Sequence, residues 1–202
     1  MNHIVVTRLL YKEGFEERFE LFQKTLLPSL EKQKNQNFDI GVLCAPEHKK
    51  RVEGLGLIAF HRKDGSYGKK RGKYWGSRAK WDDITLEKKY DIQSNIDSDD
   101  IVSEDYIDIV QKHCKGDKII HVHFHPVLYE WKTGRIKDMN KRHGPHRGSA
   151  FYSLYQPNKE NYIYIGQDSH RNMPKYADKS ILIKGHARVV IHDNNDSSSM
   201  RS

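Results

Sequence analysis

The sequence has little of what marks a secreted or membrane-spanning protein. Its 202 residues include two cysteines, Cys44 and Cys114, too few for the disulfide framework of a small secreted domain. No apolar run approaches the about 18 residues of a membrane-spanning helix. The N-terminal stretch MNHIVVTRLLYKEGF lacks the long apolar segment and small-residue cleavage site of a signal peptide. We therefore expect a reduced, cytoplasmic protein.

Negative charge is also in short supply, since the formal net charge is +8. The excess is concentrated in residues 61–80, HRKDGSYGKKRGKYWGSRAK, which combine many Lys and Arg with four glycines and one Asp. This composition predicts a mobile loop rather than a helix or strand. Such a loop attracts polyanions: a nucleotide diphosphate, nucleic acid, or an anionic membrane surface that the protein would contact peripherally.

Apolar periodicity predicts an α/β protein. Strands are predicted, from β-branched or alternating segments, at residues 4–6, 38–44, 90–97, 119–128, 162–165 and 188–191. Helices are predicted at residues 15–30, 46–51, 81–89 and 106–114. Pro28 should kink or break the first helix, and Ser103 should cap the last. Because strands and helices alternate, we expect one domain over 1–193 with a mixed, mainly parallel sheet flanked by helices, and a disordered tail over 194–202.

Carboxylates crowd into residues 94–105, which read SNIDSDDIVSED. Asp97 and Asp99 end a predicted strand two residues apart, so in extended backbone both point to the same side and can hold one cation. Oxygen ligands favour Mg²⁺ or Mn²⁺, and the edge beyond strand C-termini is where open α/β sheets bind ligands. A solvated turn is the simpler alternative. A calcium EF-hand is excluded, because Val102 and Asp108 stand where it needs Gly and Glu.

A D-x-D motif after a strand also occurs in haloacid-dehalogenase-type phosphatases, but near the N-terminus and with Thr or Val where this chain has Ile101. The third use is in glycosyltransferases. Together with SNIDSDDIVSEDYI, the stretches RFELFQKTLLPSLEKQKNQNFDIGVLC and RVVIHDNN resemble the rhamnosyltransferase family of GT-A-like glycosyltransferases. One departure is Asn95, where that family usually has Arg.

The resemblance implies a GT-A-like, Rossmann-like fold and a metal-dependent enzyme. It would move a sugar from a nucleotide-diphosphate donor, dTDP-rhamnose or a UDP-sugar, to a carbohydrate or lipid-linked acceptor. Asp97 would contact the ribose or the metal, Asp99 would bind the metal, and His192 would complete the metal shell. Ser98 would lie beside the donor, and Asp100 is a candidate for a group that contacts the metal ligands rather than the ion.

The same resemblance assigns further donor contacts. Thr7 and Arg8, after the first strand, would contact the nucleotide, and Arg78 would neutralise the phosphates, for which a guanidinium fork is suited. A surface salt bridge explains Arg8 equally well, and Arg78 could be one more charge of the basic segment. Asp168 would be the general base that takes the proton of the acceptor hydroxyl, with His170 the next candidate. A capping role is the alternative for Asp168.

Two further patterns stay open. His121, His123 and His125 share one strand face, a spacing also used by zinc sites; we interpret them as a polar face near the cleft. A different class of function is nucleic-acid binding without catalysis, in which the basic segment 61–80 contacts phosphates through Lys69, Lys70 and Arg71 and stacks on bases through Tyr67, Tyr74 and Trp75. That reading leaves the acidic motif without a purpose, so nucleic acid is the weaker hypothesis.

Overall fold

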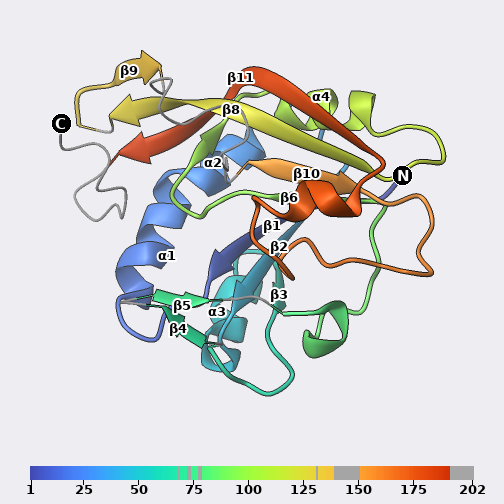
Figure 1. The fold of residues 1–202 in the computed structure, drawn as a ribbon. Helices are drawn as coiled ribbons and strands as arrows, with labels where there is room; N and C mark the ends of the chain where they lie inside the picture. The colour runs from blue at the N-terminus through green and yellow to red at the C-terminus, as the bar shows by residue number, and fades with distance from the viewer. Residues whose placement is uncertain (68, 72–73, 77–78, 131, 139–150, 192–202) are drawn as a thin grey trace.

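A nine-stranded sheet organises the computed structural model, which describes residues 1–67, 69–71, 74–76, 79–130, 132–138 and 151–191 (Figure 1). Its order is β3-β2-β1-β6-β10-β8-β11-β7, with β9 paired to β8. The strands are β1 His3–Leu9, β2 Asp39–Cys44, β3 Ile58–Phe60, β6 Ile92–Asn95, β7 Ile101–Val102, β8 Ile120–Glu130, β9 Arg135–Asp138, β10 Tyr152–Tyr155 and β11 Lys179–Ile191.

Most strands of this sheet run in one direction, and β7, β9 and β10 run against them. β1 lies parallel to β2 and β6, β2 to β3, and β8 to the long β11, while β10 runs antiparallel between β6 and β8. The predicted fold class, a mixed and mainly parallel α/β sheet, is confirmed. Because β1, β2 and β6 are parallel, their C-terminal ends meet at one edge, where the acidic motif follows β6.

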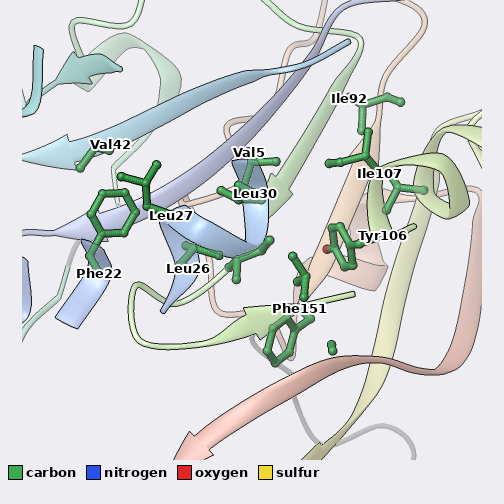
Figure 2. Close-up of a cluster of buried hydrophobic side chains, with 14 of the residues drawn as sticks. Val5, Phe22, Leu26, Leu27, Leu30, Val42, Ile92, Tyr106, Ile107 and Phe151 are labelled. Carbon is green, nitrogen blue, oxygen red and sulfur yellow. The ribbon is translucent and has the colours of Figure 1, made fainter. Parts of the chain in front are cut away.

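Helices pack against one face of this sheet. They are α1 Phe15–Lys24, α2 Leu26–Glu31, α3 Lys49–Glu53 and α4 Tyr106–His113, with short 3₁₀ turns η1 Pro46–His48, η2 Trp81–Asp83 and η3 Met173–Tyr176. Val5 of β1 packs with Leu26 and Leu30 of α2 and Ile107 of α4 in the main core (Figure 2). Each such buried side chain stabilises the fold by about 1.5–3 kcal/mol.

The other face of the sheet carries a second core. Ile4 and Val6, which alternate with Val5 along β1, pack there with Tyr164, Ile165 and residues of the 79–90 segment. Successive strand residues point to opposite faces, so the two clusters follow directly from the alternation along β1. In the described part of the chain, no helix is long and apolar enough to cross a membrane.

The first helix breaks earlier than predicted. α1 ends at Lys24 and α2 begins at Leu26, with Thr25 between them at φ −116° and ψ −81°. Pro28 still explains why the helix breaks here. A continuous helix would place the Pro28 ring against the carbonyl of Lys24, four residues earlier, and Pro28 has no N–H to donate to that carbonyl. Pro28 instead occupies the first turn of α2, where no donor is needed.

Two predicted elements are wrong. Residues 81–89 form only the turn η2 followed by irregular chain, and residues 162–165 are not a strand. In residues 162–165, side-chain amides hydrogen-bond to the backbone in place of a neighbouring strand. Gln93 accepts from the Ile165 N–H, and Gln93 and Gln156 both donate to the Ile163 carbonyl. These amides replace the strand partner that an apolar YIYI sequence would otherwise need.

The basic segment is more ordered than predicted. It contains β4 Lys69–Arg71 and β5 Tyr74–Gly76, paired antiparallel, so it is not a loop throughout. The aromatic residues of β5 favour a strand. Ahead of the pair, the Tyr67 hydroxyl donates to Glu47 of η1. The predicted cap Ser103 is also displaced, because α4 begins after Asp105, whose side chain makes no capping bond.

Candidate donor-binding site

The acidic motif forms a turn at the C-terminal edge of the sheet. β6 ends at Asn95, and the Ile96 N–H still donates to the Val6 carbonyl of β1 at 3.1 Å. A turn follows, closed by the Asp100 N–H donating to the Asp97 carbonyl at 3.1 Å. We call residues 97–100 the acidic turn. Since β1 is the neighbour of β6, the end of β1 faces this turn directly.

Two carboxylates of the acidic turn, those of Asp97 and Asp99, each form a salt bridge with an arginine. Arg8 of β1 donates to Asp97 at 3.3 Å, and the two side chains are 44% and 40% exposed. Arg18 of α1 donates to Asp99 at 2.8 Å, and this pair is more enclosed, at 15% and 17%. The Arg18 guanidinium also lies over the Tyr11 ring, 5.2 Å from its centroid. Two carboxylates and two guanidinium groups thus meet at one edge.

Asp100 points away from that edge. Its side chain is buried, and its Oδ1 accepts from the Val190 N–H of β11 at 3.1 Å. Burial, followed by the negative charges of Asp99 and Asp97, raises the pKa of the Asp100 carboxyl well above its ordinary value. Asp100 is thus held by β11 and is not presented at the edge where Asp97 and Asp99 lie.

Two predicted donor contacts are buried. Thr7 lies inside β1 rather than after it, on the helix-covered face, and its hydroxyl has no partner among the described residues. The Ser98 side chain is also buried, while its carbonyl accepts from the Thr25 hydroxyl at 3.3 Å. The expectation that Thr7 follows the strand is corrected, because β1 continues to Leu9 alongside β2. Neither side chain is presented to a ligand in this arrangement.

Asp168 lies in irregular chain instead of at a strand end. Its carboxylate accepts from four described donors: Lys175 at 2.7 Å, Asn172 at 3.0 Å, Tyr176 at 3.2 Å, and the Ser169 N–H at 2.7 Å. The hydrogen bonds from Lys175, Asn172 and the Ser169 N–H, with that of Lys175 foremost, hold the pKa of Asp168 well below its usual range. A carboxylate stabilised in this way is a weak base, so the geometry fits an anchor of the 168–176 segment better than a proton acceptor.

Tyr152 of β10 joins the acidic turn to that segment. Its ring centroid is 6.4 Å from that of His170, and its hydroxyl donates to the Ile165 carbonyl at 3.1 Å. Burial raises the pKa of the Tyr152 phenol, and the charges of Arg8, Asp97 and Asp168 also act on it. Tyr152 therefore lies between Asn95, its strand partner at the end of β6, and His170, although these residues are far apart in sequence.

The histidines of β8 share a face as predicted, but their rings stack. The His121 and His123 ring centroids are 5.1 Å apart, and each Nδ1 lies within 3.4 Å of the Ser180 hydroxyl. Stacked imidazoles do not converge on one ion. Among the residues described, no group of three or more His, Cys, Asp or Glu is arranged to hold a metal. His192 and Arg78 lie outside the described residues.

One pocket lies elsewhere. It has a volume of about 200 Å³ and is lined by Lys63, Trp81, Asp82, Ile84, Thr85, Leu86 and Glu87. None of these residues belongs to the acidic turn or its arginines, so this pocket does not define the site.

The family comparison accounts for nearly the whole chain. Residues 6–202 match the model of a family described as "Putative rhamnosyl transferase". The chain belongs to this glycosyltransferase family. The match includes every residue of the acidic turn, both arginines and the 168–176 segment, so the site just described lies wholly inside the family's domain. No curated protein matches the sequence.

Solved structures show the same fold as this rhamnosyltransferase-family chain. TarS 1–349 of S. aureus, in complex with UDP-GlcNAc, superposes with a TM-score of 0.57 at 14% identity, covering 96% of this chain and 60% of that one. A second structure, of S. aureus TarS, gives a TM-score of 0.50 at 15% identity, covering 94% of this chain and 36% of that one. This chain thus spans about 60% of TarS 1–349.

Arg18 is the site residue that the sequence reasoning missed. It stood in the quoted family stretch RFELFQ, but it received no role because 81 residues separate it from Asp99. The available signal was its place at the first turn of an otherwise acidic helix surface, beside Glu16 and Glu17. In this family member, the helix that follows β1 therefore supplies a charge to the acidic turn.

Proposed function

We propose that this protein is a metal-dependent glycosyltransferase. It would take a sugar from a nucleotide-diphosphate donor, dTDP-rhamnose or a UDP-sugar, and transfer it to a carbohydrate or lipid-linked acceptor. Family membership supports sugar transfer, and the structure of TarS with UDP-GlcNAc supports a nucleotide-sugar donor for this fold. Nothing in the described residues selects rhamnose over another sugar.

The main structural support for this proposal is the pairing of Asp97 with Arg8 and of Asp99 with Arg18 at the C-terminal edge of parallel strands. A solvated turn would leave its carboxylates to water. Here each carboxylate is held by a guanidinium, and both guanidinium groups can bind phosphate oxygens bidentately. Such an edge suits a ligand that carries phosphates and arrives with a cation.

The donor set fits Mg²⁺ or Mn²⁺. Asp97 and Asp99 supply the hard carboxylate oxygens that these ions prefer, and such ions usually keep positions for water and substrate phosphates. We infer that Asp97 and Asp99 would hold the ion and that it would stabilise negative charge on the leaving diphosphate. Arg8 and Arg18 would then turn from the carboxylates toward the phosphates, adding electrostatic stabilisation.

The general base remains a prediction with two candidates. Asp168 was the first, but its carboxylate accepts four hydrogen bonds and its pKa is depressed. His170 lies beside Tyr152, whose strand partner is Asn95 at the end of β6, just ahead of the acidic turn. An imidazole titrates close to neutral pH, which suits proton transfer. We favour His170 as the base and Asp168 as the anchor that shapes its segment.

Donor turnover tests the proposal. Release of dTDP or UDP from dTDP-rhamnose and a panel of UDP-sugars should be measured with Mn²⁺, with Mg²⁺, and after chelation. We expect at least one donor to be consumed only when a metal ion is present. Consumption that is equal after chelation would remove the metal from the proposal, and absence of nucleotide binding for every donor would refute the proposal itself.

The nucleic-acid alternative has less support, because the chain belongs to a glycosyltransferase family. It would require RNA or DNA binding with a steep salt dependence and no affinity for nucleotide sugars.

A further inference from the structure

β11 contains a backbone irregularity next to the acidic turn. Its register against β8 shifts between Lys184 and Arg188, and inside this bulge Gly185 and His186 adopt φ of 74° and 62°. Within the described ranges His186 is the one non-glycine residue with positive φ. A non-glycine residue in the left-handed region is strained by about 1–2 kcal/mol, so the surrounding structure must hold it there.

His186 hydrogen-bonds to residues 103–105, which follow the acidic turn. The His186 carbonyl accepts from the Ser103 N–H at 2.9 Å, and its Nδ1 lies 3.2 Å from the Ser103 hydroxyl and 3.0 Å from Asp105 Oδ1. Directly after the bulge, Ala187 and Arg188 pair with Val102 and Ile101 of β7. The bulge therefore turns β11 so that it can hold this short strand.

Asp100 makes a second connection to the same strand. Asp100 is 3% exposed, and its carboxyl oxygen accepts a hydrogen bond from the Val190 N–H at 3.1 Å. Ser98, on the other side of Asp99, is also 3% exposed and is fixed through Thr25. Asp99 therefore projects from between two buried and anchored neighbours, while Asp97 depends on the same turn through its carbonyl.

We propose that Asp100 and His186 are positioning residues: together they form a clamp by which β11 fixes the acidic turn, and so sets where the carboxylates of Asp97 and Asp99 point. The inference rests on the proposed function insofar as those carboxylates bind a metal ion. It assigns a task to the strain at His186 and to a buried carboxyl that itself faces away from the ligand.

Three variants separate the two halves of the clamp. Asp100→Ala removes the acceptor of the Val190 N–H, whereas Asp100→Asn keeps an oxygen in the same place. His186→Gly allows the positive φ without strain but deletes the imidazole that contacts Ser103 and Asp105. Tyr90→Phe is the matched control, because it removes a buried side chain's hydrogen bond, to Asp39, at the opposite ends of the strands.

Amide hydrogen exchange is the first readout and does not depend on catalysis. Loss of the clamp should speed exchange at residues 97–103 in Asp100→Ala and His186→Gly, but not in Asp100→Asn or Tyr90→Phe. The second readout is the Mn²⁺ concentration needed for half-maximal UDP binding in the full-length protein. Removing a group that orients metal ligands typically weakens metal binding about 10- to 100-fold, so we expect that shift in Asp100→Ala, with rescue in Asp100→Asn.

The outcomes are distinguishable. Unchanged exchange at residues 97–103 in both clamp variants would overturn the proposal. Faster exchange with an unchanged Mn²⁺ requirement would overturn the positioning role, because the clamp would then serve only the fold. If the wild-type protein binds UDP without any metal, the metal-dependent function fails, and the positioning proposal fails with it even where exchange shows the clamp.

Discussion

Exchanging Asp99 for Asn should abolish the metal-dependent stabilisation of the protein by nucleotide. Asp99 faces Arg18 at 2.8 Å, in a pair that is about one-sixth exposed on each side. A ligand present at about 100 times its dissociation constant stabilises the folded state by about 2.7 kcal/mol. For a domain of this size, each kcal/mol moves the melting temperature by about 2–4 °C. UDP or dTDP with Mn²⁺ should therefore raise the wild-type Tm by about 5–11 °C.

The variant must stay folded for this comparison to be valid. Exposed ion pairs contribute about 0–1 kcal/mol, whereas breaking a buried pair costs about 3–5 kcal/mol, so this partly enclosed pair should cost about 1–3 kcal/mol. That loss leaves most of the stability of a typical domain in place. Asp108→Asn is the matched control, because it removes an exposed carboxylate from α4 with the same change of charge.

The assay is thermal unfolding with UDP or dTDP, each with Mn²⁺ and with chelator. Wild type and Asp108→Asn should show the shift only with Mn²⁺, and Asp99→Asn should show none of the metal-dependent part. An equal shift with and without chelator in the wild type would refute the bridging role of Asp99. So would a full metal-dependent shift in Asp99→Asn.

Three further predictions concern other parts of the chain. His170→Gln should lower turnover by about 10²-fold or more with UDP binding unchanged, whereas Asp168→Asn should also lower the Tm; a His170→Gln enzyme with wild-type kcat would move the base elsewhere. Burial, and then the charge of His123, lowers the pKa of His121 to about 4. As the pH drops from about 6.5 towards 4, His121 takes up a proton in the unfolded chain but not in the folded protein, so the free energy of unfolding should fall. In urea unfolding, the His121→Gln variant should show a smaller change of unfolding free energy with pH, and a change equal to that of the wild type would contradict this. Limited proteolysis within residues 61–80 should slow when UDP and Mn²⁺ are added, because we expect this segment to close over the diphosphate; an unchanged cleavage rate would count against closure.

The elements that could be predicted are those whose own residues show an apolar pattern that indicates which face is buried. β1, β2, β6 and α4 each show an apolar run or alternation, because one face of each packs against the core. β10 was missed although it is central, since its sequence YSLY carries a serine in the interior. That Ser153 is buried because it bonds to Ser94 of the neighbouring β6, a partner that no local pattern reveals.

The candidate site divides in the same way. Asp97 and Asp99 could be found because their spacing and their place after a strand are local features. Arg18, Tyr152 and the anchoring of Asp168 could not, because each depends on how distant segments pack. Thr7 failed for a related reason: the apolar pattern ended at Val6, but pairing with β2 carries the strand to Leu9 and turns Thr7 inward.

The crowding of acids in a basic chain has a physical consequence for the order of binding. Of the acids in residues 97–105, Asp97 and Asp99 face Arg8 and Arg18, while Asp100 and Asp105 bind β11. A diphosphate that approached alone would meet two carboxylates whose arginines are already engaged, so repulsion would offset the attraction. A divalent ion that bound the carboxylates would release both arginines for the phosphates.

Nucleotide and metal should therefore bind with positive coupling, each raising the affinity for the other by the same factor. Calorimetric titration of UDP at several fixed Mn²⁺ concentrations measures this factor, and an affinity for UDP that does not change with Mn²⁺ would show that the arginines are not released in this way.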